Sequence, residues 1–226
     1  MFVSAASAQT IAGKLYVEAG AGITHANGDF ARQVRDSVAN SPTLRFDSAT
    51  YDRTGSAGGR VAIGWQFTPM LAAELAYASF GRHETTASAT RSTLPGFITV
   101  ADGRFRVSAV TLDAVGQLPL TGPLSASARI GVAMTEQQYA QGRRNTGPGA
   151  GASEPEQFVG FPANRQTRLH WGVGAQYALN PNAALVANYE RIERVGRDFS
   201  SAGPDGGVRA GTFGYGLLSV GLRYTF

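Results

Sequence analysis

Apolar and polar residues alternate along most of this chain with a period of two, the pattern of β-strands that present different faces to different surroundings. In the first such segment Leu15, Val17 and Ala19 fall on one face, and Lys14 and Glu18 fall on the other. The alternation recurs in eight segments, at 14–23, 60–67, 71–78, 106–118, 124–132, 168–177, 183–190 and 218–226. Each has about the 9 to 11 residues that a tilted membrane strand needs.

The fourth segment loses its phase where it begins. Phe105 and Val107 are apolar but share the parity of the polar residues Thr111 and Asp113. A β-bulge would shift the phase, and so would an extension of the strand beyond the membrane. Both explanations remain open from the sequence.

The connections between segments alternate between short and long. The short ones contain proline, at 68–70, 119–123 and 180–182, and the long ones cover 24–58, 81–103, 135–165 and 193–211. One end with tight turns and one end with long loops describes an up-and-down barrel. We therefore expect an all-β fold, an eight-stranded antiparallel transmembrane β-barrel, with no regular structure in the Gly- and Pro-rich stretch 145–155.

Two kinds of barrel share this alternation, because a soluble lipocalin-like barrel places its apolar face inward and a membrane barrel places it outward. The polar face here is rich in small residues such as Gly20, Ser127 and Gly172, which suit a narrow lumen. Aromatic residues such as Trp65 and Tyr224 lie near strand ends on the apolar face, as in the aromatic girdles of membrane barrels. Both observations favour an apolar exterior.

Composition is consistent with this choice. Hydrophobic residues make up 43% of the 226 residues and the mean hydropathy is −0.12. No apolar run approaches the roughly 18 to 20 residues of a membrane helix. A membrane interpretation therefore requires strands, whose alternation keeps the mean hydropathy near zero.

The C-terminal segment carries the most specific resemblance. Leu218, Val220, Leu222, Tyr224 and Phe226 alternate up to a terminal aromatic residue, which resembles the assembly signal of bacterial outer-membrane proteins. The stretches 14–22 and 185–191 are similar to strands of the OmpA-like, OmpX-like and opacity-protein barrels of the porin family. The resemblance implies a monomer in a Gram-negative outer membrane, with lipid, lipopolysaccharide and the barrel-assembly machinery as partners.

Charged residues on the polar face are expected to fill the lumen. This predicted lumen cluster consists of Glu18, Arg60, Glu74, Asp113, Arg129, Arg168, Glu190 and Arg223, with Lys14 also inward. Nearly balanced charges at similar depth predict ion pairs between Arg223 and Glu18 and between Arg129 and Asp113. A solvated polar lumen is the alternative.

Other chemistry finds little support in the sequence. There is no cysteine, the carboxylates are dispersed, and we expect no metal and no cofactor. A pI near 9.7 suggests nucleic acid only if arginines share one face, and here they are scattered, so we expect no nucleic-acid partner. Loop arginines such as Arg143 and Arg144 could bind lipopolysaccharide phosphates, although solvated charges are the simpler interpretation.

Three histidines bear on catalysis. Some barrels resembling this one are lipid A-modifying enzymes with a histidine and a serine at the external rim. His83, with Glu84 and Ser88 nearby, matches no such motif, and His25 is expected in a loop. For His170 we expect a hydrogen-bonding role in the lumen, so we predict no enzyme.

The N-terminus carries one end of a secretory signal. Ala6, Ser7 and Ala8 match a cleavage site, but the basic region is missing. We interpret 1–8 as a signal-peptide remnant and 9–226 as the barrel, with a disordered N-terminus as the alternative. The leading function is a non-enzymatic barrel for envelope integrity, adhesion or contact with host or envelope ligands through its loops. A narrow channel for small solutes and a lipid A-modifying enzyme are the alternatives.

Overall fold

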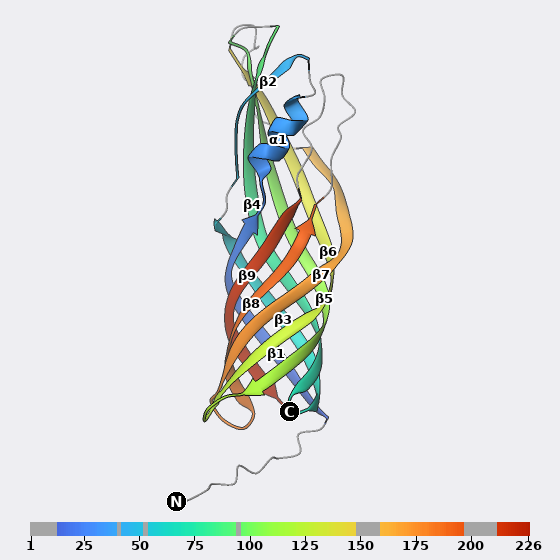
Figure 1. Ribbon diagram of the computed structural model, residues 1–226, viewed down its shortest axis with the longest axis vertical. Helices are drawn as coiled ribbons and strands as arrows, with labels where there is room; N and C mark the ends of the chain where they lie inside the picture. Colours follow the sequence, from blue (N-terminus) through green and yellow to red (C-terminus); the bar gives the residue numbers. More distant parts are fainter. Residues whose placement is uncertain (1–12, 40–41, 52–53, 94–95, 148–158, 197–211) are drawn as a thin grey trace, which may run out of the picture.

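The computed structural model describes residues 13–39, 42–51, 54–93, 96–147, 159–196 and 212–226 (Figure 1). The predicted signal-peptide remnant and most of 145–155 and 193–211 lie outside these residues, although Asn145 and Thr146 belong to a strand. The elements, in chain order, are β1 Lys14–Asn27, α1 Phe30–Ala39, β2 Leu44–Tyr51, β3 Thr54–Thr68, β4 Leu71–Arg91, β5 Ile98–Pro119, β6 Leu124–Thr146, β7 Val159–Ala178, β8 Ala183–Val195 and β9 Phe213–Thr225.

Eight of these strands form a closed antiparallel ring. The order β4-β3-β1-β9-β8-β7-β6-β5 is completed by the pairing of β4 with β5, which closes the sheet on itself. β2 stands outside the ring and pairs with the far part of β4, from Thr85 to Arg91. The predicted eight-stranded antiparallel β-barrel is confirmed.

The tight turns gather at one end of the barrel, which we call the short-turn end (Figure 1). The hydroxyl of Thr68 accepts hydrogen bonds from the backbone N–H groups of Met70 and Leu71. The side-chain oxygen of Asn180 accepts them from Asn182 and Ala183 in the same way. These side-chain oxygens accept hydrogen bonds from backbone N–H groups that a tight turn leaves without a backbone acceptor. The C-terminus lies at this end, and the opposite end is the long-loop end.

The apolar face of each strand points outward. Leu75, Val173 and Val220 expose 50%, 50% and 56% of their surface, whereas their inward neighbours Glu74 and Ala76 expose 1% and 3%. The lipocalin-like alternative is therefore wrong for this chain. Within the described residues no helix has the length and apolar character to cross a membrane.

Four strands extend far beyond this apolar belt. β4, β5, β6 and β7 have 21, 22, 23 and 20 residues, and they rise together toward the long-loop end (Figure 1). The prediction of loops at 81–103 and 135–165 is thus wrong over most of their length. Thr- and Ser-rich alternation, as in 85–90, is compatible with strands in water and does not require a loop.

The same parity holds along the whole of β5. Asp113 and Thr111 point inward in the belt, and Val107 and Phe105 point inward beyond it, all nearly fully buried. The pairing of β5 with β6 continues from Ile98 to Pro119 without a register shift. Of the two explanations for the phase change, the extension of the strand beyond the membrane is therefore correct, and the β-bulge in β5 is not. Outside the belt water replaces lipid, so the strand turns its apolar side inward.

Between the extended strands and the first long connection lies an apolar core. It contains the buried residues Ala26, Phe30, Val34, Val38, Ala78, Phe80, Ala87, Val107, Ala109, Ala133, Ile192, Val195, Phe213, Tyr215 and Leu217. We call it the outer core. It fills the barrel toward the long-loop end.

A helix covers the outer core where the sequence predicted only loop. α1 begins after Asp29, whose carboxylate accepts a hydrogen bond from the N–H of Arg32 and caps the helix. Phe30, Val34 and Val38 recur every four residues and enter the outer core together. This period was visible in the sequence, but the prediction of one long loop over 24–58 overlooked it. α1, β2 and the ends of β1 and β3 occupy most of that stretch.

Candidate functional site

Beneath the outer core, at the level of the apolar belt, the barrel interior is polar and charged. Glu18, Arg60, Glu74, Arg129 and Glu190 each expose 4% or less of their surface. Buried charges of this kind are costly unless each meets an opposite charge and further hydrogen bonds. Each member of the predicted lumen cluster should therefore have a partner of opposite charge and further hydrogen bonds.

Arg60 stands at the centre of the network. Its guanidinium contacts Glu18 at 2.9 Å and Glu190 at 2.5 Å, and it also donates to Glu74. These carboxylates come from β1, β8 and β4, so one arginine on β3 ties together strands from opposite sides of the ring.

Two further arginines complete the balance. Arg223 donates to Glu18 at 2.7 Å and lies 4.3 Å from the centre of the Tyr16 ring. Arg129 donates to Glu190 at 2.5 Å and to the side-chain oxygen of Asn188 at 2.9 Å. Among these described side chains three guanidinium groups meet three carboxylates. The predicted pair Arg223–Glu18 is confirmed.

The predicted pair Arg129–Asp113 is wrong. Asp113 accepts a hydrogen bond from the Thr111 hydroxyl at 2.8 Å and bonds the ring nitrogen Nδ1 of His170 at 2.7 Å. The predicted hydrogen-bonding role of His170 in the lumen is thereby confirmed. Asp113 and His170 form a second polar group beside the arginine network, and Glu190 lies 3.8 Å from the other ring nitrogen.

Glycines explain which residues pair. Arg129 on β6 and Glu190 on β8 are not on neighbouring strands, but both are in register with Gly172 of β7. Since Gly172 has no side chain, Arg129 reaches across it to Glu190. Asp113 reaches across Gly131 to His170 in the same manner.

A third contact has the same geometry. Tyr16 and Glu74 flank Gly64 in register, and the Tyr16 hydroxyl donates to Glu74 at 2.9 Å. A Cβ atom on Gly64 would lie 2.1 Å from the Tyr16 ring, so the contact needs the glycine. Tyr16 and Asn188 belong to the site although neither was predicted as a site residue. The sequence did contain a signal for both residues, because both occupy positions on the polar face of the two-residue alternation.

Two predicted inward charges do not join the network. Arg168 is half-buried nearer the long-loop end, where it donates to Gln166 at 2.7 Å. Lys14 is half-buried at the short-turn end, at the start of β1. The network therefore holds seven of the eight predicted cluster residues once Asp113 and its bond to His170 are included.

The other two histidines serve packing contacts. The buried ring of His83 lies 3.0 Å from the carbonyl oxygen of Phe80 and contacts Tyr215. Glu84 is on the outer face of β4, so it cannot work with His83 as a catalytic pair. His25 stacks on Tyr189 at a ring distance of 5.7 Å. In the described ranges no three His, Asp or Glu side chains gather in a way that would hold a metal ion.

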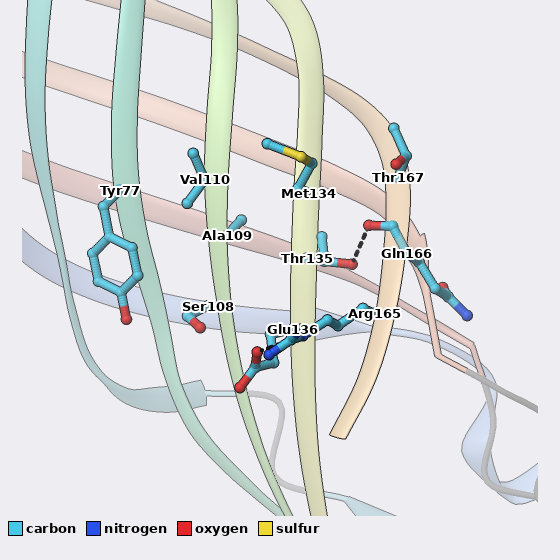
Figure 2. A pocket seen from close by; sticks show the side chains of 10 residues that line it. All are labelled: Tyr77, Ser108, Ala109, Val110, Met134, Thr135, Glu136, Arg165, Gln166 and Thr167. Carbon is cyan, nitrogen blue, oxygen red and sulfur yellow. Dashed lines mark hydrogen bonds and ion pairs between the residues drawn. The ribbon is translucent and has the colours of Figure 1, made fainter. Parts of the chain in front are cut away.

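The outer wall has a groove at the edge of the apolar belt, which we call the rim groove. Its volume is about 580 Å³, and Figure 2 shows the lining side chains on β4 to β7. Tyr77, Val110 and Met134 are its large apolar residues, and Glu136 pairs with Arg165 on its polar side.

The five predicted assembly residues occupy the outer face of β9 and the chain end. Leu218, Val220, Leu222, Tyr224 and Phe226 are each between 47% and 62% exposed. The backbone N–H of Phe226 donates to the carbonyl of Leu15, which holds the end of the chain against β1. The end of the chain is thus bonded into the wall.

A closed antiparallel ring with an apolar outer belt and a charged, buried interior defines a transmembrane β-barrel of the outer-membrane type. The family model of the OmpA-like transmembrane domain matches residues 11–226, and the chain belongs to that family. It is accordingly a protein of the bacterial outer membrane.

The chain is similar to several solved outer-membrane proteins. A major outer membrane protein from Thermus thermophilus is 19% identical, with 95% of this chain and 100% of that chain covered and a TM-score of 0.49. OprG from Pseudomonas aeruginosa is 14% identical, with 96% and 99% covered and a TM-score of 0.48. Neisserial surface protein A is 16% identical, with 94% and 97% covered and a TM-score of 0.47. No curated protein sequence matches this chain significantly.

The glycine geometry yields a prediction. Replacing Gly64 by alanine should force Tyr16 away from Glu74 and lower the free energy of unfolding by about 1–3 kcal/mol, the usual cost of overpacking. Gly116→Ala is the matched control, because the nearest atom to its added Cβ would be at 3.9 Å. Urea unfolding in lipid vesicles, followed by the fluorescence of Trp65 and Trp171, measures both. Equal stability of the two variants would contradict the role assigned to Gly64.

Proposed function

We propose that this chain is a non-enzymatic, non-conducting barrel that supports the envelope and presents a binding surface at its long-loop end. The observation that carries the proposal is the filled interior. A polar layer of ion pairs and the apolar outer core succeed each other along the barrel axis, and α1 lies over the outer core. An eight-stranded barrel is just wide enough for such side chains.

The projecting part of the barrel is the natural contact surface. β4, β5, β6 and β7 carry polar residues on their outer faces beyond the belt, and β2 extends the sheet on one side. The Tyr51 hydroxyl at the end of β2 accepts a 3.3 Å hydrogen bond from the N–H of Gly28, which ties β2 to the segment before α1. A rigid sheet held well above the membrane supports adhesion, or contact with another envelope component or a host ligand.

The channel alternative needs a continuous water path through the barrel. Arg60 at 3% exposure blocks the polar layer, and Phe80 and Leu217 at 0% block the outer core. The enzyme alternative needs a histidine, a serine and an acid in reach of one another. Ser88 lies on the part of β4 that pairs with β2, and its hydroxyl is hydrogen-bonded to the hydroxyl of Ser48 on β2 instead.

Conductance tests the proposal. In a planar bilayer we expect no steady openings from the wild-type barrel. Glu18→Ala should produce openings or lower stability, because it removes one carboxylate that pairs with both Arg60 and Arg223. Glu136→Ala, in the exposed pair on the outer wall, should behave as the wild type does. Large, stable wild-type openings would refute the proposal and favour the channel.

We also propose that the last strand is read by the barrel-assembly machinery from the short-turn end, on the periplasmic side. The support is the terminal pattern of outward apolar residues that ends at Phe226. The orientation follows from the rule that outer-membrane barrels keep short turns in the periplasm and long loops outside.

Deleting Phe226 should reduce the amount of folded barrel in the outer membrane of cells. Barrel refolded from urea should lose at most about 1.5–3 kcal/mol, the value for moving one aromatic side chain fully out of water, because Phe226 is removed from water by lipid and not by the protein. Phe226→Tyr keeps the terminal aromatic ring and should assemble normally. Heat-modifiable gel mobility of membrane fractions gives the folded amount, and wild-type levels of the deletion variant would exclude an assembly role.

A further inference from the structure

A second groove lies on the outer wall, directly beyond the rim groove, and we call it the basic groove. It has a volume of about 460 Å³ and is lined on its polar side by Arg82, Arg104, Arg106 and Gln138. The arginines come from the outer faces of β4 and β5, where all three are exposed.

The three arginines lie close together although their positive charges repel one another. Arg82 and Arg106 are directly opposite each other in the register of β4 and β5. Like charges at opposite positions on neighbouring strands destabilise a sheet. Arg82 and Arg104 share the carboxylate of Glu84, at 3.3 and 3.5 Å. In the described part of the chain Arg106 has no carboxylate within ion-pair distance.

A bulge places Arg82 on this face. Even-numbered residues of β4 point inward from Ala72 to Phe80, which would also send residue 82 inward. The register shift between Ser79 and Arg82, with Gly81 at a φ of 71°, reverses this, so that Arg82 points outward and His83 is buried. Bulges commonly redirect a side chain toward a functional site. Here the bulge sets a second arginine opposite Arg106.

The height of the basic groove identifies the ligand. On the outer face of β5 the continuous run of apolar residues that forms the belt ends at Val110, and Arg106 follows four residues farther toward the long-loop end. At about 3.3 Å per residue and a strand tilt near 40°, Arg106 lies about 10 Å farther from mid-membrane than Val110. That is the level of the phosphate groups of the outer leaflet, immediately beyond the hydrocarbon core.

The rim groove supplies the other half of an amphiphile site. Tyr77, Val110 and Met134 offer an apolar surface on the side of the groove nearer mid-membrane, at the top of the view in Figure 2, where an acyl chain would lie. The arginines above can bind a phosphate through paired N–H groups. A ligand with a phosphate directly above acyl chains fits both grooves, and in the outer leaflet that ligand is lipopolysaccharide.

We propose that Arg82, Arg104 and Arg106 bind a phosphate of the lipid A part of lipopolysaccharide, with an acyl chain along the rim groove. This rests on the proposed surface function and names its lipid partner. The site is on the wall of the barrel, nearer the belt than Arg143 and Arg144, which were predicted in a loop and belong to the far end of β6. Because the site lies outside the lumen, its failure in a binding test would leave the conductance result untouched, and the reverse also holds.

The test measures binding of purified, folded barrel in detergent to bisphosphorylated lipid A and to the same lipid A without phosphates. We expect the double variant R82Q/R106Q to bind bisphosphorylated lipid A at least about tenfold more weakly than the wild type. Glutamine keeps much of each side chain's stem, which protects the fold. The matched control R143Q/R144Q removes the same charge from exposed positions at the far end of β6, farther toward the long-loop end, and should stay within about twofold.

Three results of this binding experiment would overturn the proposal. Tight binding of the phosphate-free lipid by the wild type, or wild-type affinity in folded R82Q/R106Q, would overturn the proposal. Equal loss in R143Q/R144Q would also overturn it, by showing general attraction of charge. If R82Q/R106Q does not fold, the single variant R106Q, which removes the arginine without a carboxylate partner, is measured by the same criteria. Heat-modifiable mobility confirms the folded state of every sample.

Discussion

Closure of eight strands into a ring leaves an interior that only side chains can fill, and this constraint governs the rest of the structure. The outer face of the belt must be apolar, so the two-residue period sends the polar residues inward. Inside, they have no water to solvate them and must satisfy one another. Arg60 bound to three carboxylates from different strands is the direct result. Such a network favours one register of the barrel, because a shift of any strand would leave a charge without its partner.

The same strands obey the opposite rule beyond the membrane. On β5, Leu112 faces lipid and Asp113 faces the interior, whereas Arg106 faces the polar surroundings beyond the hydrocarbon core and Phe105 faces the interior. The backbone alternation is unchanged, and only the surroundings of the outer face differ. The filled interior therefore has a charged part within the belt and an apolar part above it. The bulge in β4 is a local exception that moves Arg82 to the outer wall.

Much of the architecture could be predicted from sequence because alternation and proline turns are local signals. The eight strands, the three short turns and the outward apolar face all followed from them. The extended strands did not, because a test for lipid-facing alternation fails once the outer face is polar. α1 was missed for a different reason: Phe30, Val34 and Val38 have helical spacing inside a stretch assigned to loop by its length.

The site was predictable as a set of residues but only in part as a set of contacts. Arg223 and Glu18 are directly opposite on neighbouring strands, so their pairing followed from strand order. Arg129 pairs with Glu190 across Gly172, and that choice depends on the register of three strands at once. Barrel shear fixes this register, and no local pattern reveals it. Glycines between charged residues on the polar face are the signal that such contacts leave in a sequence.

A closed, dry interior along both layers can be tested directly by cysteine labelling. The natural chain has no cysteine, so single substitutions report one position each. Ser219→Cys places a thiol in the polar layer and Ala133→Cys places one in the outer core, at residues 2% and 0% exposed, while Thr86→Cys lies on the outer surface. In intact folded barrels, a charged water-soluble thiol reagent should label Thr86→Cys fully and leave the two interior cysteines unmodified until the protein is unfolded. Labelling of either interior cysteine at the rate of Thr86→Cys would show an open, water-filled lumen and contradict the account.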